Sequence, residues 1–184
     1  MPPVQRIYIA GFMGVGKSTV TPRVAKYAGF TSIDLDTEVS DHLGLSIPGI
    51  FELLGEDVFR QTEKKLLVEM SQTPSLAVSL GGGAVCNQEI LDLCLETGVV
   101  IYLKSSPSFL ARRLSKSRNV RPKLFDQDGV MMRGSSLEQR VVELLSERQR
   151  FYEQAHFTVH VDEFTTSQIA KQILQRIRTW QKGT

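Results

Sequence analysis

Short apolar segments alternate along the chain with longer segments in which apolar residues recur at every third or fourth position. The short segments are rich in β-branched and aromatic residues and are followed closely by Gly, Asp or Ser. This pattern is typical of strands buried on both faces of a parallel sheet. We predict five strands, at Ile7–Ala10, Phe30–Asp34, Leu76–Leu80, Val99–Leu103 and Phe157–Val161.

The helical pattern is clearest in the last twenty residues, where one apolar stripe is surrounded by charged and amide residues. The stripe consists of Ile169, Ile173, Leu174, Ile177 and Trp180. Ser46 suits a helix N-cap and Pro107 suits a first helical turn. We predict further helices directly after the glycine-rich segment Gly11–Ser18 and at Ser46–Leu54, Glu56–Ser71, Gln88–Glu96, Pro107–Ser115 and Ser135–Ala155.

The alternation of strands and helices predicts a doubly wound α/β fold with five parallel strands. A chain of 184 residues fits one domain with a substantial core, residues 1–184. Pro22 falls inside the helix predicted after the glycine-rich segment, where it removes one backbone hydrogen bond. Ligands of such sheets bind beyond the C-terminal ends of the strands, so the polar residues found there are the first candidates for a site.

The first strand is followed by Gly11-x-x-x-x-Gly16-Lys17-Ser18, the spacing of a phosphate-binding loop. Glycines let several backbone N–H groups converge on phosphate oxygens, and the helix that follows presents its N-terminal N–H groups to the same anion. We expect Lys17 to reach the β- and γ-phosphates and Ser18 to ligate Mg²⁺. The predicted nucleotide contacts are Gly14, Val15, Gly16, Lys17, Ser18 and Thr19.

The second strand ends in Asp34-Leu35-Asp36, and two carboxylates two apart on an extended segment would point the same way. The functional interpretation assigns Asp34 to Mg²⁺, through water, and Asp36 to an acceptor hydroxyl as hydrogen-bond partner and base. The alternative is a helix N-cap followed by a solvated acid. A preceding phosphate-binding loop favours the functional interpretation.

Two further features suit a small acidic ligand. Gly81–Gly83 follow the third strand, and three glycines let a ligand lie against the backbone, although a tight turn would also explain them. Arg60 and Glu63 are three apart on a predicted helix. They are either a surface ion pair or an arginine held in place to bind a carboxylate.

The segment that includes Asn119–Leu124 is basic and has no steady periodicity, so we interpret residues from about 116 to 134 as a lid or a solvated basic loop. An arginine on a lid would neutralise charge at a transferred phosphate. Near the end of the long helix, Arg148 or Arg150 is placed either to reach the site or to remain on the surface.

The formal net charge of +2 gives no reason to expect binding to nucleic acid or to a membrane surface. Cys86 and Cys94 match no metal spacing, and we expect free thiols. The sequence shows no charged-then-apolar leader and no apolar run approaching 18 residues, so we expect a cytoplasmic protein.

Taken together, these residues resemble the shikimate kinase family over nearly the whole chain. The matching features are the phosphate-binding loop, Asp34 with Asp36, Phe59-Arg60 with Glu63, Gly81–Val85, Val120-Arg121-Pro122, and Arg148 four before Tyr152. The resemblance implies a P-loop, three-layer α/β/α fold like that of the nucleoside monophosphate kinases, with sheet order 2-3-1-4-5. It also implies substrate-binding helices at about 35–71.

The resemblance further implies transfer of the ATP γ-phosphoryl group to the 3-hydroxyl of shikimate with Mg²⁺, by a monomer. Asp36 would hold the acceptor hydroxyls, Arg60 and Arg148 would bind the shikimate carboxylate, and Gly82 would contribute backbone contacts. Arg121 would lie near the transferred phosphate as a catalytic residue, and Arg113 near adenine. The residues that would line the shikimate ring are Ile47, Phe51, Phe59 and Pro122.

The sequence departs from the family pattern in three places. Lys123 stands where the family tends to have an apolar residue, the segment from Phe125 to Ser136 is long, and the corner Val161-Asp162-Glu163 lacks the small hydroxyl or amide residue often found there by adenine. We therefore expect differences in the geometry of the lid and in the adenine contacts.

Three alternatives remain. A kinase of another hydroxy acid, such as gluconate, would share the phosphate-binding loop, but we would not expect the Arg60, triple-glycine and Arg148 set. A GTPase switch would carry an [NT]-K-x-D motif, and no such tetrapeptide occurs. A non-catalytic nucleotide-binding regulator is disfavoured by the joint presence of Lys17, Ser18, Asp34 and Asp36.

Overall fold

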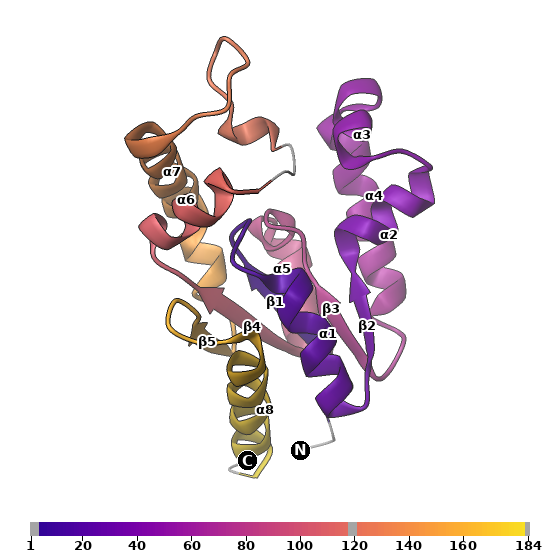
Figure 1. Ribbon diagram of the computed structural model, residues 1–184. Coiled ribbons are helices and arrows are strands. Elements are labelled where there is room, and N and C mark those ends of the chain that lie inside the picture. Colours follow the sequence, from indigo (N-terminus) through magenta and orange to yellow (C-terminus); the bar gives the residue numbers. More distant parts are fainter. Residues whose placement is uncertain (1–3, 118–120, 183–184) are drawn as a thin grey trace.

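The computed structural model describes residues 4–117 and 121–182, except for the side chain of Pro122. One sheet of five parallel strands runs through the molecule in the order β2-β3-β1-β4-β5, which confirms the predicted fold class and strand order (Figure 1). The strands are β1 Arg6–Gly11, β2 Thr31–Asp34, β3 Leu76–Ser79, β4 Val99–Lys104 and β5 Phe157–His160. Each lies within one residue of its predicted range at either end.

The α-helices within the described residues cover both faces of this sheet (Figure 1). They are α1 Lys17–Ala28, α2 Leu35–Leu43, α3 Ile47–Leu53, α4 Gly55–Met70, α5 Gln88–Thr97, α6 Pro107–Ser115, α7 Gly134–Tyr152 and α8 Thr166–Lys182. Ser46 caps α3 by accepting the backbone N–H of Gly49, and α6 begins at Pro107, as predicted. α1 continues as an α-helix through Pro22.

Alternating strand residues contribute to two apolar clusters. In β1, Ile7 and Ile9 pack with residues of α1, α6, α7 and α8, whereas Tyr8 and Ala10 pack with residues of α2, α3, α4 and α5. Both sets are almost completely buried, which explains why the strand sequences are apolar throughout. The central strands are thereby held rigidly between two layers of helices.

The prediction that Asp34 and Asp36 share one extended segment is wrong. β2 ends at Asp34, and α2 begins at Leu35, so Asp36 lies in the first helical turn. Asp34 occupies the N-cap position of α2, but its side chain makes no capping hydrogen bond. A strand-to-helix turn without intervening residues is the local feature that the two-residue spacing could not show.

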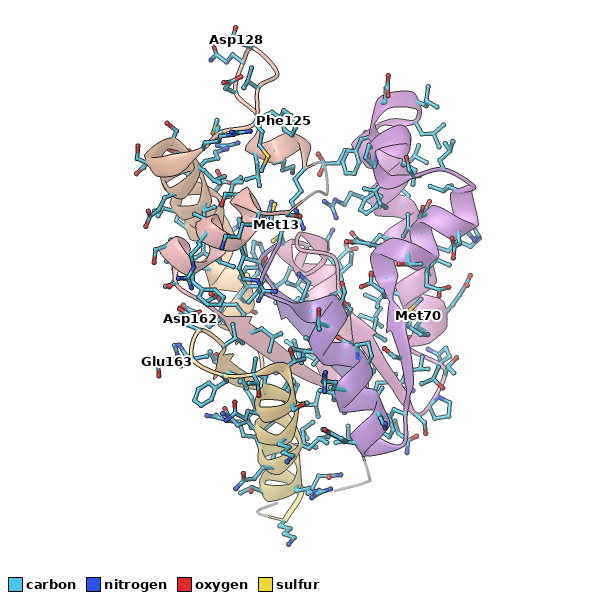
Figure 2. The ribbon with its side chains drawn as sticks, in the orientation of Figure 1. Met13, Met70, Phe125, Asp128, Asp162 and Glu163 are labelled. Atoms are coloured by element: carbon cyan, nitrogen blue, oxygen red, sulfur yellow. The ribbon has the colours of Figure 1, made fainter. Side chains whose placement is uncertain are left out.

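The segment 121–133 lies over the strand ends, across from α2, α3 and α4 (Figure 1). It contains a short 3₁₀-helix, η2, at Pro122–Leu124, and a tight hairpin closed by the bridge between Phe125 and Met131. Figure 2 shows Phe125 at the base of this hairpin and Asp128 at its tip. The long segment noted in the sequence is therefore an ordered turn, anchored by the fully buried side chain of Leu124.

Candidate active site

The glycine-rich loop joins the end of β1 to the first turn of α1. Gly16 is the N-cap residue of α1 with φ of 109°, and Gly14 has φ of 81°, a region that side chains other than glycine rarely adopt. No side chain caps α1. The first backbone N–H groups of the helix are therefore presented beyond the strand ends, where they suit an anion.

Lys17 is buried beneath this loop. Its Nζ atom donates hydrogen bonds to the carbonyl oxygens of Gly11, at 2.8 Å, and Phe12, at 3.2 Å. Burial lowers the pKa of Lys17 to about 8, while the nearby carboxylates of Asp36 and Asp34 act in the opposite direction. The Lys17 ammonium can therefore contact a phosphate group in the loop without any movement of the loop backbone.

Ser18 and Thr19 follow Lys17 in the exposed first turn of α1. A serine hydroxyl and the Asp34 carboxylate are oxygen donors of the kind that Mg²⁺ prefers, with remaining positions left to water and phosphate. On the other side of the loop, Arg113 of α6 donates to the carbonyl oxygen of Val15 at 3.4 Å. These predicted nucleotide contacts therefore lie in the glycine-rich loop or directly beside it.

Asp36 points from α2 toward Gly81 at the end of β3. A Cβ atom on Gly81 would lie 2.7 Å from Asp36 Oδ1 and 2.6 Å from Glu63 Oε1, so a larger residue there would displace one or both carboxylates. Burial raises the pKa of Asp36, and the charge on Lys17 acts against that rise. Two carboxylates from different helices therefore meet at one glycine.

Glu63 is completely buried and holds Arg60. Its Oε2 atom accepts a hydrogen bond from Arg60 Nη1 at 2.6 Å, whereas its Oε1 atom has no hydrogen-bond partner among the described residues. Burial raises the pKa of Glu63 to about 7, because the nearby charge of Arg60 only partly offsets the loss of water. The pair is thus not a plain surface ion pair, because one of its two members lies in the interior.

Arg148 reaches the same region from α7 and is only 8% exposed. Its Nη1 atom donates to the carbonyl oxygen of Gly82 at 2.9 Å, and the hydroxyl of Tyr152, one turn later, donates to the same oxygen at 2.5 Å. The guanidinium carbon also lies 5.4 Å from the centre of the Phe12 ring. Of the two arginines considered from the sequence, Arg148 faces the site and Arg150 is exposed.

These side chains line one pocket of about 420 Å³ at the strand ends. Its apolar wall includes Phe51 and Phe59, whose ring centres are 5.1 Å apart. Met13, which is labelled in Figure 2, lines the pocket from the glycine-rich loop. The full lining is Met13, Asp36, Ile47, Phe51, Glu56, Phe59, Arg60, Gly81, Gly82, Gly83, Arg121, Lys123 and Arg148.

The chain is similar in sequence and structure to proteins of one family. The family model described as "Shikimate kinase" matches residues 13–178. A shikimate kinase from Prosthecochloris aestuarii is 36% identical over 180 residues, which cover 96% of this chain and 91% of the relative. The chain belongs to the shikimate kinase family.

Solved structures agree with this assignment. The structure of shikimate kinase from Acinetobacter baumannii in complex with shikimate has a TM-score of 0.85 and 31% identity, covering 96% of this chain and 94% of that chain. A gluconokinase from Sinorhizobium meliloti has a TM-score of 0.59 and 17% identity, covering 97% of this chain and 94% of that chain, which shows a shared fold and nothing more.

The pocket brings together the residues that the family resemblance selected from distant parts of the sequence. Asp36, Arg60, Gly82, Arg121 and Arg148 all line it. Of the predicted ring walls, Ile47, Phe51 and Phe59 are present, and the side chain of Pro122 lies outside the described residues. Asn119 and Val120 of the predicted lid also lie outside them.

Three pocket residues were not singled out from the sequence. Met13 lies within the phosphate-binding loop, whose pattern leaves its position unspecified, and Lys123 was noted only as a departure from the family. Glu56 lies four residues before Arg60, a helical spacing that could have identified it as a partner of that arginine.

The corner after β5 is where we expected the adenine contacts to differ from those of the family. Asp162 accepts hydrogen bonds from the hydroxyl of Ser105, at 2.5 Å, and from the backbone N–H of Ser106, at 3.0 Å. These contacts tie the corner to the start of α6. The carboxylate therefore has a structural role in the fold.

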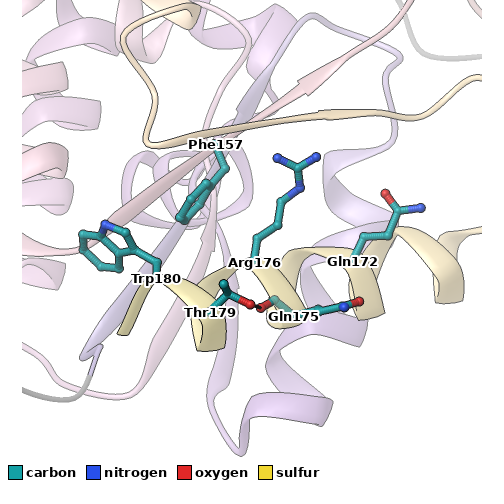
Figure 3. A pocket seen from close by; sticks show the side chains of 6 residues that line it. All are labelled: Phe157, Gln172, Gln175, Arg176, Thr179 and Trp180. Carbon is teal, nitrogen blue, oxygen red and sulfur yellow. Dashed lines mark hydrogen bonds between the residues drawn. The ribbon is translucent and has the colours of Figure 1, made fainter. Parts of the chain in front are cut away.

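A second hollow, of about 480 Å³, lies between α8 and the start of β5 (Figure 3). The described residues that line it are Phe157, Gln172, Gln175, Arg176, Thr179 and Trp180. Phe157 is the first residue of β5, so this hollow lies at the N-terminal ends of the parallel strands, and the glycine-rich loop lies at their C-terminal ends. None of these described lining residues carries a carboxylate that could act on an acceptor hydroxyl.

Proposed function

We propose that this chain transfers the γ-phosphoryl group of ATP to the 3-hydroxyl of shikimate, producing shikimate 3-phosphate and ADP. Membership of the shikimate kinase family supports the reaction. The observation that carries the proposal is the convergence of Arg60 and Arg148, from helices far apart in sequence, on a pocket that also contains Asp36. Two guanidinium groups, one carboxylate and an apolar wall suit a small hydroxylated acid.

The nucleotide half of the site consists of the glycine-rich loop and the start of α1. Backbone N–H groups at Gly14, Val15 and Gly16 and the Lys17 ammonium hold the phosphates, and Thr19 adds a contact in the first turn. Ser18 and Asp34 provide oxygen donors for Mg²⁺, which neutralises phosphate charge when bound. Arg113 lies against the loop, close to where the base of ATP would extend.

In the acceptor half, Asp36 orients the 3-hydroxyl and accepts its proton. The hydroxyl oxygen forms the new bond to the γ-phosphorus atom, the bond from that atom to the β,γ-bridging oxygen breaks, and ADP leaves. Arg121 approaches from the segment 121–133 and stabilises the charge on the transferred group. Its Nη1 atom donates to the Ser117 hydroxyl at 2.8 Å, which orients the side chain.

The substrate carboxylate binds between Arg60 and Arg148. Arg60 is held by Glu63, and Arg148 is held by its hydrogen bond to Gly82, so both cations are oriented before the ligand arrives. A planar guanidinium fork matches both oxygens of a carboxylate, which a lysine ammonium does not. This arrangement favours an acid over a neutral polyol of similar size.

We also propose that the chain acts as a cytoplasmic monomer and a single kinase domain, residues 1–184. Within it, the helices at about 35–71 bind the substrate and the segment at about 116–134 serves as a lid. Among the described residues, no helix has the length and apolar character needed to span a membrane. The modest net charge of +2 gives no reason to expect a nucleic-acid or membrane partner.

A coupled assay of ADP release across shikimate, quinate and gluconate tests the reaction directly. Shikimate should be preferred over gluconate because it presents its carboxylate and hydroxyl on a rigid ring, and over quinate because its ring double bond keeps the carboxylate-bearing carbon planar. Preference for gluconate would favour the other small-molecule kinase, and no acceptor-dependent ADP release would favour the non-catalytic regulator.

The carboxylate clamp is tested by comparing shikimate with its methyl ester in wild type, Arg60→Ala and Arg148→Ala. Wild type should strongly prefer the acid. Each variant should lose about 2–4 kcal/mol in kcat/KM for the acid and most of the acid preference, because a desolvated carboxylate loses a partner. Replacement of either arginine by lysine should recover only part of this loss.

Arg150→Ala is the matched control, because Arg150 is an exposed arginine on the same helix as Arg148. It should change kcat/KM by less than about 0.5 kcal/mol. The same acid-to-ester ratio in wild type and in both pocket variants would show that the clamp does not exist.

A further inference from the structure

Glu56 is shared between the carboxylate clamp and the opposite side of the pocket. Its Oε1 atom lies 3.2 Å from Nη2 and 3.4 Å from Nε of Arg60, one turn later on α4. The same oxygen lies 3.3 Å from the Nζ atom of Lys123 in η2. One carboxylate oxygen therefore contacts two cations from different elements.

The position of Glu56 matters for the proposed substrate. It faces the edge of Arg60 that carries Nε and Nη2, while Glu63 pairs with Nη1. A ligand carboxylate needs two N–H groups on one edge of the guanidinium. Glu56 thus occupies an edge that the ligand would use, and its negative charge would repel an incoming carboxylate.

The positive charge of Lys123 opposes the negative charge of Glu56, and the backbone around Lys123 is held in place by other contacts. Its carbonyl oxygen accepts a hydrogen bond from Arg140 Nε of α7 at 3.2 Å, and the neighbouring Leu124 is fully buried. Burial acts to raise the pKa of Glu56, but hydrogen bonds from Arg60 and the charge of Lys123 hold it below its usual value. Glu56 is therefore ionised at neutral pH and paired on both sides.

We propose that Lys123 is a specificity-determining residue for acidic acceptors, because it neutralises Glu56 and so leaves Arg60 available to the substrate carboxylate. The inference deepens the proposed function and rests on it. Lys123 gives Glu56 a cationic partner besides Arg60, so the guanidinium edge that carries Nε and Nη2 can be released to a substrate carboxylate. Without Lys123, Glu56 keeps Arg60 as its partner, and the substrate carboxylate must compete with Glu56 for that edge. Because Glu56 is 45% exposed and Lys123 is 43% exposed, the pair is weak enough to rearrange when substrate binds.

The test measures steady-state kinetics of Lys123→Met, which keeps most of the length of the side chain and removes its charge. The KM for shikimate should rise about three- to tenfold, the size expected when one partly screened carboxylate, that of Glu56, competes with the ligand for Arg60, while kcat changes by less than about twofold. The preference for shikimate over its methyl ester should fall by a similar factor. The KM for ATP should stay within about twofold of wild type.

Glu56→Gln decides whether the effect passes through Glu56. In the Glu56→Gln background, Lys123→Met should raise the KM for shikimate by less than about twofold, because no charge remains to neutralise. Lys123→Arg keeps the positive charge and should therefore retain the wild-type KM. Added salt should reduce the effect of Lys123→Met. An equal rise in KM with and without Glu56 would overturn the proposal.

Lys64→Met is the control for a general loss of positive charge. Lys64 lies on α4, the helix of Glu56 and Arg60. It is half exposed and pairs with Glu89 instead of Glu56. A rise in KM as large as that of Lys123→Met would assign the effect to overall charge and overturn the inference. Failure of wild type to phosphorylate shikimate would instead count against the proposed function, so the two failures are distinguishable.

Discussion

A buried carboxylate destabilises a folded protein unless both of its oxygens are well paired. Glu63 has no exposed side-chain surface, and among the described residues only its Oε2 atom finds a hydrogen-bond partner. Its burial raises the pKa to about 7, from an ordinary value of 4.5. The orientation of Arg60 therefore has a cost in stability, which is typical of residues that position a binding site.

The pH dependence of this cost has a definite sign. A carboxylate whose pKa is higher in the folded state binds a proton more readily when folded, so its penalty is complete above pH 7 and decreases as the pH falls toward 4.5. Glu63→Gln should raise the free energy of unfolding by roughly 1–3 kcal/mol at pH 8, and by less at pH 5. Urea denaturation at the two pH values measures the difference.

Glu52→Gln is the control, because Glu52 is an exposed acid on the neighbouring helix α3. It should change stability by a similar small amount at both pH values. If Glu63→Gln instead lowers the free energy of unfolding, and lowers it more at pH 8 than at pH 5, the ion pair with Arg60 outweighs the burial penalty, and our account of Glu63 is wrong.

At the scale of the element, the starts of α1 and α5 differ in how their first N–H groups are satisfied. α5 begins with Asn87, whose Oδ1 atom accepts hydrogen bonds from the N–H groups of Glu89, at 2.9 Å, and Ile90, at 3.3 Å. α1 begins with Gly16 and has no side-chain cap. The first N–H groups of α1, the helix proposed to bind phosphate, thus have no side-chain acceptor, whereas the Asn87 side chain satisfies two of those of α5.

Asn87→Ala should destabilise the protein by about 1 kcal/mol, because two N–H groups of α5 lose their acceptor. Asn87→Asp should retain most of the stability, since aspartate is an equally good N-cap. The midpoint of thermal or urea unfolding measures both. Gln175→Ala, at an exposed position in the middle of α8, is the control and should have little effect. A loss from Asn87→Ala no larger than that of the control would show that the cap contributes nothing.

At the scale of the whole molecule, the sheet separates two apolar clusters that together form the core. Cys94 of α5 belongs to the cluster that also contains Tyr8 and Tyr102, and it has no exposed surface. Burial raises the pKa of its thiol far above the usual range. Cys86 is partly exposed, and burial also raises its pKa. Both are free thiols, as the sequence predicted.

Cys94 should therefore report global unfolding. In a Cys86→Ser variant, the remaining thiol should react with a thiol reagent at least about 100-fold more slowly in the native protein than in denaturant, because its exposure requires opening of the core. In wild type, Cys86 should react first. Rapid labelling of Cys94 under native conditions would show that α5 opens locally without global unfolding.

The features that the sequence by itself determined are local. The spacing Gly11–Ser18, the apolar strand segments and the helix starts at Ser46 and Pro107 each depend on backbone preferences and hydrogen bonds within a few residues. The alternation of these elements predicted the parallel sheet, and the family resemblance supplied its strand order. The resemblance also selected Asp36, Arg60, Gly82, Arg121 and Arg148, which all line the pocket.

The features that only the tertiary structure decided depend on contacts between distant segments. Whether Arg60 was a surface charge or part of a site could not be told from its spacing to Glu63, because the burial of Glu63 is set by how α4 packs against the sheet. Asp34 and Asp36 suggested an extended pair, yet the abrupt start of α2 turned Asp36 toward Gly81 and Glu63. The meeting of Glu56 and Lys123 across the pocket has no local signal at all. Periodicity and turn chemistry act along the chain, whereas burial and the charge around a side chain come from whatever the fold brings beside it.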